Sequence, residues 1–245
     1  MKKQLPGSFP QEILPELISY LKQLERRGIK SLYLGDIQDR GSSDTVPSID
    51  PESEASTAVI STKGELAKLE ATVKACTDCP LHERRTQAVF GVGNPRSKVI
   101  FIGEAPGRDE DLKGEPFIGR AGQLLTKIFE AIDLKREDVY ITNILKCRPP
   151  DNRDPQESEV RCCEKYLIAQ IEVIKPRLIC ALGRVAAQWL LQTNATLGSM
   201  RTGEYYYQGT RVLVTYHPAA LLRNPNFKRP AWEDFKKLKA MMEEC

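Results

Sequence analysis

The stretch SKVIFIGEAPG, residues 97–107, decides the fold class of this chain. It begins with an apolar run rich in β-branched residues, which is typical of a buried strand, and it ends in a turn of Gly and Pro. Similar apolar runs recur along the chain, and segments with helical periodicity separate them. The predicted strands are residues 97–104, 138–145, 177–183 and 211–217, and the predicted helices are residues 64–75, 121–132, 155–175, 184–192 and 230–244.

This alternation of strands and helices predicts an α/β fold. Buried strands separated by helices imply a central four-stranded parallel sheet with helices on both faces, which is a three-layer α/β/α sandwich. Ligands of such sheets bind beyond the carboxyl ends of the strands. Those ends lead here into GEAPG (103–107), TNILK (142–146), ALGR (181–184) and YHPAALLRNP (216–225). The polar groups suited to chemistry in these turns are Glu104, Asn143 and His217.

Residues 1–62 differ in character from the rest and are interpreted as an N-terminal extension to a domain of residues 63–245. Apolar residues at helical spacing predict an amphipathic helix over residues 11–27. Residues 36–57 are rich in Ser, Asp, Pro and Glu, which predicts a flexible linker. The helix could dock an unknown protein partner, and a weakly ordered tail is the alternative.

The composition favours a globular protein that does not act at a membrane. The chain has 245 residues, of which 41% are hydrophobic and 28% are charged. It contains no apolar run long enough to span a bilayer and no segment that resembles a signal peptide. We therefore expect a cytoplasmic protein, and we expect it to be a monomer. The formal net charge of +3 fits a polyanionic partner but does not establish one.

The cysteines follow a pattern that suits several kinds of site. Seven thiols in a chain without an export signal argue against a disulfide framework. Cys76 and Cys79 form a CxxC pair, whereas Cys147 and one member of the doublet Cys162–Cys163 are single thiols far away in the sequence. This spacing fits an iron–sulfur cluster, a zinc site or buried structural thiols, and the spacing alone leaves all three open.

Short motifs follow one another over roughly residues 65–243, and together they are far more specific than any one of them. They are CTDCPL (76–81), GEAPGRDED (103–111), GEPFIGRAGQLL (114–125), TNILKCRPPDNRDP (142–155), EVRCCEKYL (159–167), ALG (181–183) and HPAALLRNP (217–225). In this order they resemble the family 4 uracil-DNA glycosylases, the iron–sulfur members of the uracil-DNA glycosylase superfamily.

The resemblance implies a DNA repair enzyme that flips uracil out of DNA and hydrolyses its N-glycosidic bond, which starts base excision repair. The alternatives are a superfamily relative with a broader range of deaminated bases and a non-catalytic iron–sulfur protein that binds nucleic acid. Uracil-containing DNA is the implied partner.

The resemblance also implies a 4Fe-4S cluster as the cofactor. The family places the fourth ligand three residues before the Tyr-Leu of its helix, which identifies Cys163 by counting back from Tyr166. Cys162 would then be a spare or packing residue, because it points about 100° away around the helix. The implied ligands are Cys76, Cys79, Cys147 and Cys163.

Roles for the strand-end residues follow from the chemistry of base release. His217 would hydrogen-bond a uracil carbonyl oxygen and stabilise the departing anion, and Glu104 would position or activate water. Asn143 offers an acceptor and a donor that match N3–H and O4 of uracil. Phe117 resembles the family residue that stacks on the flipped base. The substrate-binding turn adds Gly103 and Ala105.

Several charged and apolar residues are candidates for holding the DNA. Leu222 and Arg223 lie in a segment that resembles the loop entering the duplex, so they are wedge candidates. Glu110 and Asp111 match an acidic pair of the family, and a solvated acidic loop is the alternative reading. The candidates for phosphate contacts are Arg120, Lys146, Arg148 and Arg153.

Overall fold

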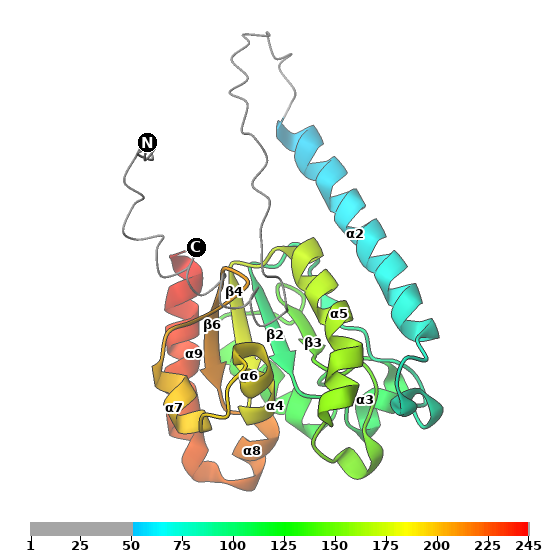
Figure 1. The fold of residues 1–245 in the computed structure, drawn as a ribbon. Coiled ribbons are helices and arrows are strands. Elements are labelled where there is room, and N and C mark those ends of the chain that lie inside the picture. The colour runs from blue at the N-terminus through cyan, green and yellow to red at the C-terminus, as the bar shows by residue number, and fades with distance from the viewer. Residues whose placement is uncertain (1–50, 245) are drawn as a thin grey trace, which may run out of the picture. The chain divides into compact units, whose positions relative to one another are not determined.

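The computed structural model describes residues 51–244, with side chains from residue 62 onward (Figure 1). Helix α2 (Pro51–Ala75) begins inside the segment 36–57 that composition predicts to be a linker, and it continues past residue 62. Its first residue is a proline, which suits the first turn of a helix. The helix expected over residues 11–27, its docking role and residues 36–50 of the expected linker lie outside the described residues.

One sheet forms the centre of the described unit, in the spatial order β1-β3-β2-β4-β6-β5. The pairs β3–β2, β2–β4 and β4–β6 are parallel, so the predicted α/β fold with a parallel core is confirmed. The strands are β1 (Val92–Gly93), β2 (Val99–Gly103), β3 (Tyr140–Asn143), β4 (Leu178–Leu182), β5 (Tyr205–Tyr207) and β6 (Thr210–Thr215).

The number of strands differs from the prediction of a four-stranded sheet, because the sheet has six. The additional strands β1 and β5 pair antiparallel at its two edges. They have only two and three residues. Strands this short cannot show the alternation of apolar and polar residues by which a strand is recognised in a sequence.

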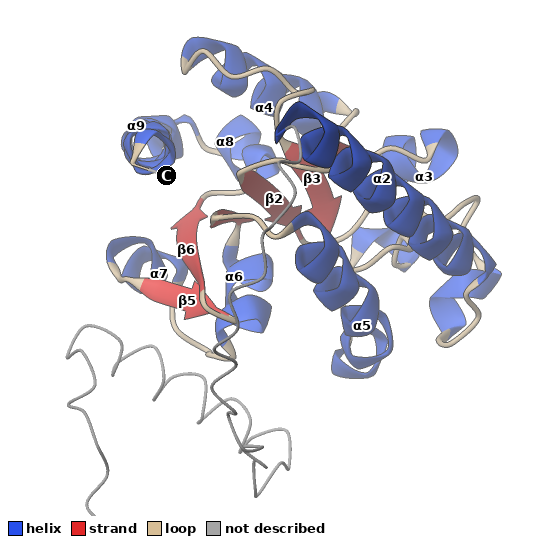
Figure 2. Ribbon diagram, turned by 90° about the horizontal axis from the view of Figure 1, so that it is seen from above, coloured by secondary structure: helices blue, strands red, loops and turns tan. Residues whose placement is uncertain are grey.

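Helices cover both faces of the sheet, as Figures 1 and 2 show. Val99 and Phe101 pack with α4 and α9 on one face, while Ile100 and Ile102 pack with α2, α5 and α6 on the other. The alternation arises because successive side chains of a strand point to opposite faces. These helices are α4 (Arg120–Ala131), α5 (Glu157–Ile174), α6 (Arg184–Leu191) and α9 (Lys228–Glu243). None of the described helices is long and apolar enough to cross a membrane.

Short helices occupy several of the connections. Gly107 is the N-cap of α3, in the turn that follows β2, and His217 is the N-cap of α8, in the turn that follows β6. Their brevity explains why helical periodicity does not reveal them. The short elements are α3 (Arg108–Lys113), α7 (Leu197–Thr202), α8 (Pro218–Arg223), η1 (Pro80–Glu83), η2 (Pro150–Asn152) and η3 (Pro225–Phe227).

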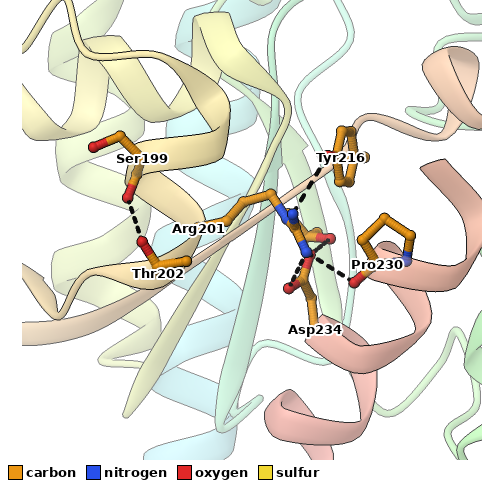
Figure 3. Close-up of polar contacts among 7 residues, drawn as sticks. Ser199, Arg201, Thr202, Tyr216, Pro230 and Asp234 are labelled. Atoms are coloured by element: carbon orange, nitrogen blue, oxygen red, sulfur yellow. Dashed lines mark hydrogen bonds and ion pairs between the residues drawn. The ribbon is translucent and has the colours of Figure 1, made fainter.

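A largely buried ion pair ties α7, β6 and α9 together (Figure 3). Arg201 donates from Nε and Nη2 to the two carboxylate oxygens of Asp234, at 2.7 and 2.8 Å, and Thr215 donates to the same carboxylate at 2.7 Å. The guanidinium also lies 4.5 Å from the ring centroid of Tyr216. Because Thr215 and Tyr216 directly precede His217, this network fixes the backbone that carries the histidine.

We expect Asp234→Ala to lower the free energy of unfolding by about 3 kcal/mol, because it leaves a poorly solvated guanidinium without its partner. The Arg201 side chain is only 14% exposed. Glu233→Ala is the matched control, since it breaks an exposed ion pair with Lys236 on the same helix and surface pairs contribute little. Urea unfolding followed by circular dichroism measures both changes. Equal losses in the two variants would contradict the structural role of the buried pair.

Candidate active site

A pocket of about 500 Å³ opens at the carboxyl edge of the parallel strands, which is the position that the fold class predicts. The turns that follow β2, β3, β4 and β6 all contribute to its wall. Gly103 and Leu222 are not part of the lining, although both neighbour residues that are. The predicted site residues that line the pocket are Glu104, Ala105, Phe117, Asn143, His217 and Arg223.

The floor of the pocket depends on a close contact between Gly103 and Asn143, which are register partners at the ends of β2 and β3. A Cβ atom on Gly103 would lie 2.3 Å from Asn143 Oδ1 and 2.5 Å from Phe117 Cζ, so only glycine permits this approach. Asn143 is 2% exposed, and its Oδ1 has no hydrogen-bond partner among the described residues. A buried acceptor without a partner is costly, which points to an atom that receives its donor from a ligand.

Phe117 forms an aromatic wall of the pocket from a tightly held loop. Its φ of 53° lies in the left-handed region, which residues other than glycine seldom adopt. Glu110 Oε1 accepts hydrogen bonds from the N–H groups of Ile118 and Gly119, at 3.0 and 2.9 Å. Gly122 leaves room for the loop, since a Cβ there would lie 1.7 Å from the Phe117 carbonyl oxygen. Glu110 therefore supports the backbone on which the aromatic ring depends.

His217 presents a neutral imidazole beside that ring. Burial, assisted by the charge of Arg223, lowers the pKa of His217 to about 4, so the ring is uncharged at neutral pH. Its Nδ1 accepts a hydrogen bond from the N–H of Ala219 at 3.1 Å, which assigns the ring proton to Nε2. The imidazole and the Phe117 ring lie 5.4 Å apart, centroid to centroid. The histidine can thus donate a hydrogen bond from Nε2 without carrying a charge.

Glu104 directly follows β2 and is partly buried in the pocket wall. Burial, with a smaller contribution from the Asp154 carboxylate, raises the pKa of Glu104 to about 7, and Arg184 acts in the opposite direction. Asp154 and Arg184 both line the pocket, and they form an ion pair at 2.9 Å. A carboxyl group with a pKa near 7 can take up and release a proton at physiological pH.

Asp154 and Arg184 are pocket residues without a role predicted from the sequence. Arg184 stands immediately after the strand end ALG, and this position was the signal that could have found it. Helices α3 and α4 and strand β3 lie between Glu104 and Asp154 in the sequence. No local pattern in the sequence therefore indicates that the two residues come together. Only the tertiary structure places both carboxyl groups in one pocket wall.

Lys146, one of the basic residues predicted to contact phosphate, lies in the interior of the protein. Lys146 is 1% exposed, so the prediction that it contacts DNA is wrong. Its Nζ donates to Thr142 Oγ1, Asn143 O and Gln170 Oε1 at 2.6, 2.8 and 2.6 Å. A lysine is ordinarily at the surface, and nothing in the neighbouring residues indicates that the fold encloses this one.

The remaining charged candidates divide between structural and exposed positions. Arg153 lines the pocket, but its terminal nitrogens Nη1 and Nη2 donate to the Glu159 carboxylate at 2.9 and 2.5 Å. Asp111 is buried and accepts a hydrogen bond from the N–H of Thr86 at 2.9 Å, so it does not belong to a solvated loop. Arg120 is exposed at the start of α4, and its contact with phosphate, like that of Arg148, stays a prediction.

The end of α8 projects apolar and basic groups next to the pocket. Leu222 is 42% exposed, which is unusual for a large aliphatic side chain in this protein. Arg223, the next residue, is exposed and lines the pocket. The helix begins at the N-cap His217, so the imidazole and these side chains lie on one short element.

The predicted cluster ligands lie around a second recess that shares no lining residue with the pocket. They come from the end of α2, the start of η1, the loop after β3 and helix α5. Among the described residues, no group of three or more His, Cys, Asp or Glu side chains is arranged to hold a metal ion. The cysteines that line the recess are Cys76, Cys79, Cys147, Cys162 and Cys163.

Hydrogen-bond donors reach two of these thiols. Arg85 Nη1 lies 3.1 Å from Cys147 Sγ, and the backbone N–H of Lys146 donates to Cys163 Sγ at 3.3 Å. Cys163 is buried, whereas Cys162 is partly exposed. The two members of the doublet therefore differ in environment, and Cys163 is the one that contacts the loop of Cys147.

Several known proteins similar to this chain are uracil-DNA glycosylases. The description of the matching family model is the uracil DNA glycosylase superfamily, and it matches residues 90–236, a range that contains every pocket residue named above. A type-4 uracil-DNA glycosylase of Archaeoglobus fulgidus is 47% identical over 174 residues, which are 68% of this chain and 87% of the relative. A type-4 uracil-DNA glycosylase of Thermotoga maritima is 43% identical over 176 residues, which are 70% and 92%. A type-5 uracil-DNA glycosylase of Pyrobaculum aerophilum is 32% identical over 148 residues, which are 53% and 64%.

The pKa of Glu104 leads to a pH dependence of stability. Between the ordinary value of 4.5 and the folded value of about 7, the folded protein binds more protons than the unfolded chain, so the free energy of unfolding falls as pH rises. Glu104→Gln resembles the protonated form and should gain stability relative to the unaltered protein between pH 4 and pH 8. Urea unfolding across that range measures the difference.

Glu137→Gln is the control, because its carboxylate is exposed and is not part of the pocket lining. This variant should follow the unaltered protein at every pH. A stability difference between Glu104→Gln and the unaltered protein that stays constant with pH would contradict the raised pKa.

Proposed function

Since the chain belongs to the uracil DNA glycosylase superfamily and to its type-4 branch, we propose that it releases uracil from DNA by hydrolysing the N-glycosidic bond, the first step of base excision repair. The observation that carries this proposal is the unpartnered, buried Oδ1 of Asn143 in a pocket that also holds Phe117 and the neutral His217. These groups supply an acceptor, an aromatic surface and an uncharged donor in one cavity.

Recognition of uracil follows from the Asn143 amide. A base that leaves the duplex enters a pocket where its edge meets fixed polar groups. The unpartnered Oδ1 would accept from N3–H of uracil, and the amide NH₂ would donate to O4. Cytosine presents the reverse pattern at these positions, so it would leave buried polar groups unpaired. Phe117 would stack on the base, and its loop is already held by Glu110.

Stabilisation of the departing base falls to His217. Negative charge develops on the uracil as its bond to the sugar breaks, and a preorganised donor aimed at the carbonyl oxygen lowers the energy of that state. The Nε2–H of a neutral imidazole supplies this donor. Since the pKa of His217 is about 4, the ring would be neutral when the substrate binds, and it would stabilise the anion through a hydrogen bond rather than through a positive charge.

Glu104 would act on water and on the sugar. The sugar becomes positively charged as the base departs, and a carboxylate on the pocket wall offsets that charge and orients the attacking water. The Asp154–Arg184 pair stands beside it and tunes its ionisation. With a pKa of about 7, Glu104 would be ionised in about half of the molecules at neutral pH.

Binding to DNA would involve the end of α8. The exposed Leu222 could enter the base stack at the position that the flipped nucleotide vacates, and Arg223 could contact the backbone. Action as a monomer and a cytoplasmic location stay predictions.

The cofactor proposed for the cysteine recess is a 4Fe-4S cluster held by Cys76, Cys79, Cys147 and Cys163. The donor set fits, because thiolates are the ligands of such clusters and N–H groups of Arg85 and Lys146 reach two of the sulfur atoms. When bound, the cluster would join segments that are distant in sequence. The residues that it ties together belong to α2, α5 and the loop after β3, which leads from the Asn143 strand.

Uracil release from a duplex with a single U:G pair tests the proposed reaction. We expect His217→Ala to lower kcat/KM by about 10²–10³, because an oxyanion donor is lost, and Glu104→Gln to lower it by about 10²–10⁴. In the unaltered enzyme the rate should rise with pH through about 7 as Glu104 ionises, and this rise should be absent in Glu104→Gln.

Glu137→Gln controls for the loss of a carboxylate and should leave the rate unchanged, because this residue is exposed and outside the pocket. The proposal is wrong if the unaltered protein releases no uracil. It is also wrong if the double variant of His217 and Glu104 keeps the full rate.

The cysteine doublet gives a separate test of the cofactor. Cys163→Ser should lose the cluster, since the buried thiol beside the Cys147 loop is the proposed ligand, whereas Cys162→Ser should retain it. Iron content and visible absorption of the purified proteins measure the outcome. Loss in the Cys162 variant with retention in the Cys163 variant would reverse the assignment.

A further inference from the structure

Lys146 is a buried cation that the proposed catalytic mechanism does not use. Its side chain is among the largest that the fold encloses completely. The ammonium group donates to Thr142 Oγ1 and Gln170 Oε1, both at 2.6 Å, and to the carbonyl oxygen of Asn143 at 2.8 Å. Three acceptors match its three N–H donors, so its hydrogen bonds are complete.

The positive charge of Lys146 is not balanced by its surroundings, because the three acceptors of its hydrogen bonds are uncharged. Among the residues that the structure describes, no carboxylate forms an ion pair with this lysine, whereas Lys165 and Lys239 each pair with an aspartate. A buried charge without an opposite charge is strongly unfavourable. The hydroxyl, amide and carbonyl groups satisfy the donors but leave the net charge uncompensated.

The groups that could compensate it are the neighbouring thiols. Lys146 lines the cysteine recess together with Cys147 and Cys163, whose thiolates would carry the opposite charge. The backbone N–H of the same lysine donates to Cys163 Sγ at 3.3 Å. Lys146 is therefore attached to the cysteine recess by its backbone and to the strand that carries Asn143 by its ammonium group.

We propose that Lys146 is the buried counter-cation of the iron–sulfur cluster. The inference rests on the cofactor proposed above, because four thiolates that hold a cluster would supply the negative charge that the ammonium lacks. A fixed cation next to a cluster favours its more negative, reduced state, and net charge and hydrogen bonding are among the factors that set the reduction potential of such clusters. Lys146 should thus raise that potential and strengthen retention of the cluster.

The test replaces the charge while keeping the size of the side chain. Lys146→Met removes the ammonium group, and Lys146→Gln removes the charge but retains a hydrogen-bond donor. Both should shift the midpoint potential of the cluster to more negative values in the full-length protein, measured by redox titration. Both should also lose the cluster at least about tenfold faster in the presence of an iron chelator, a factor that corresponds to about 1.4 kcal/mol.

Two control variants separate charge from packing. Lys165→Met removes a lysine whose exposed ammonium group pairs with Asp78 near the same recess, and solvent screens such a charge. Thr142→Val removes one hydrogen bond of Lys146 and keeps its charge. The midpoint potentials of both controls should stay at the value of the unaltered protein.

The possible outcomes are distinct. A shift in the two Lys146 variants alone, or loss of the cluster from folded Lys146 variants alone, supports the proposal. An unchanged potential in these variants, or an equal shift in Thr142→Val, overturns it. A protein that holds no cluster overturns it together with the proposed cofactor, and uracil release by that same protein would leave the proposed glycosylase reaction standing.

Discussion

The absence of a side chain at Gly103 is the constraint on which the site depends. β2 and β3 pair in parallel so that Gly103 faces Asn143, and the space that a Cβ would fill is occupied by the amide oxygen and by the Phe117 ring. The contact brings an acceptor and an aromatic surface together at the end of the sheet. The other pocket groups are then arranged around it, because β4 and β6 end at the same edge.

Buried charge networks fix the backbone on either side of this contact. The Arg201–Asp234 pair holds Thr215 and Tyr216, which lead into His217. On the other side, Lys146 holds the carbonyl of Asn143 and reaches the cysteine recess through its backbone. Asn143 and His217, which would hydrogen-bond uracil, therefore extend from segments that are anchored by charged groups in the interior. Such anchoring suits a site in which donors must be in place before the reaction begins.

Much of this arrangement could be predicted from the sequence. The parts that could not be predicted have one physical cause in common. Long apolar strands and periodic helices carry a strong local signal, so β2, β3, β4 and β6 and their parallel pairing could be predicted, whereas their order in the sheet was not. The edge strands β1 and β5 are too short to show any period. Glu104, Asn143 and His217 were found because the carboxyl ends of parallel strands converge, a rule that needs no contact information. The burial of Lys146 and the approach of Asp154 to Glu104 depend on long-range packing, which no local pattern reports.

The most direct measurement of the central claim is single-turnover release of uracil from duplex DNA by Gly103→Ala. Its added methyl group would lie 2.3 Å from Asn143 Oδ1 and 2.5 Å from Phe117 Cζ, so it would displace the amide or the ring. Misplacement of substrate-positioning groups by about 1 Å can lower a rate by about 10². The account therefore predicts a folded protein with a loss of at least that size. A folded Gly103→Ala variant that releases uracil at the rate of the unaltered protein would contradict it.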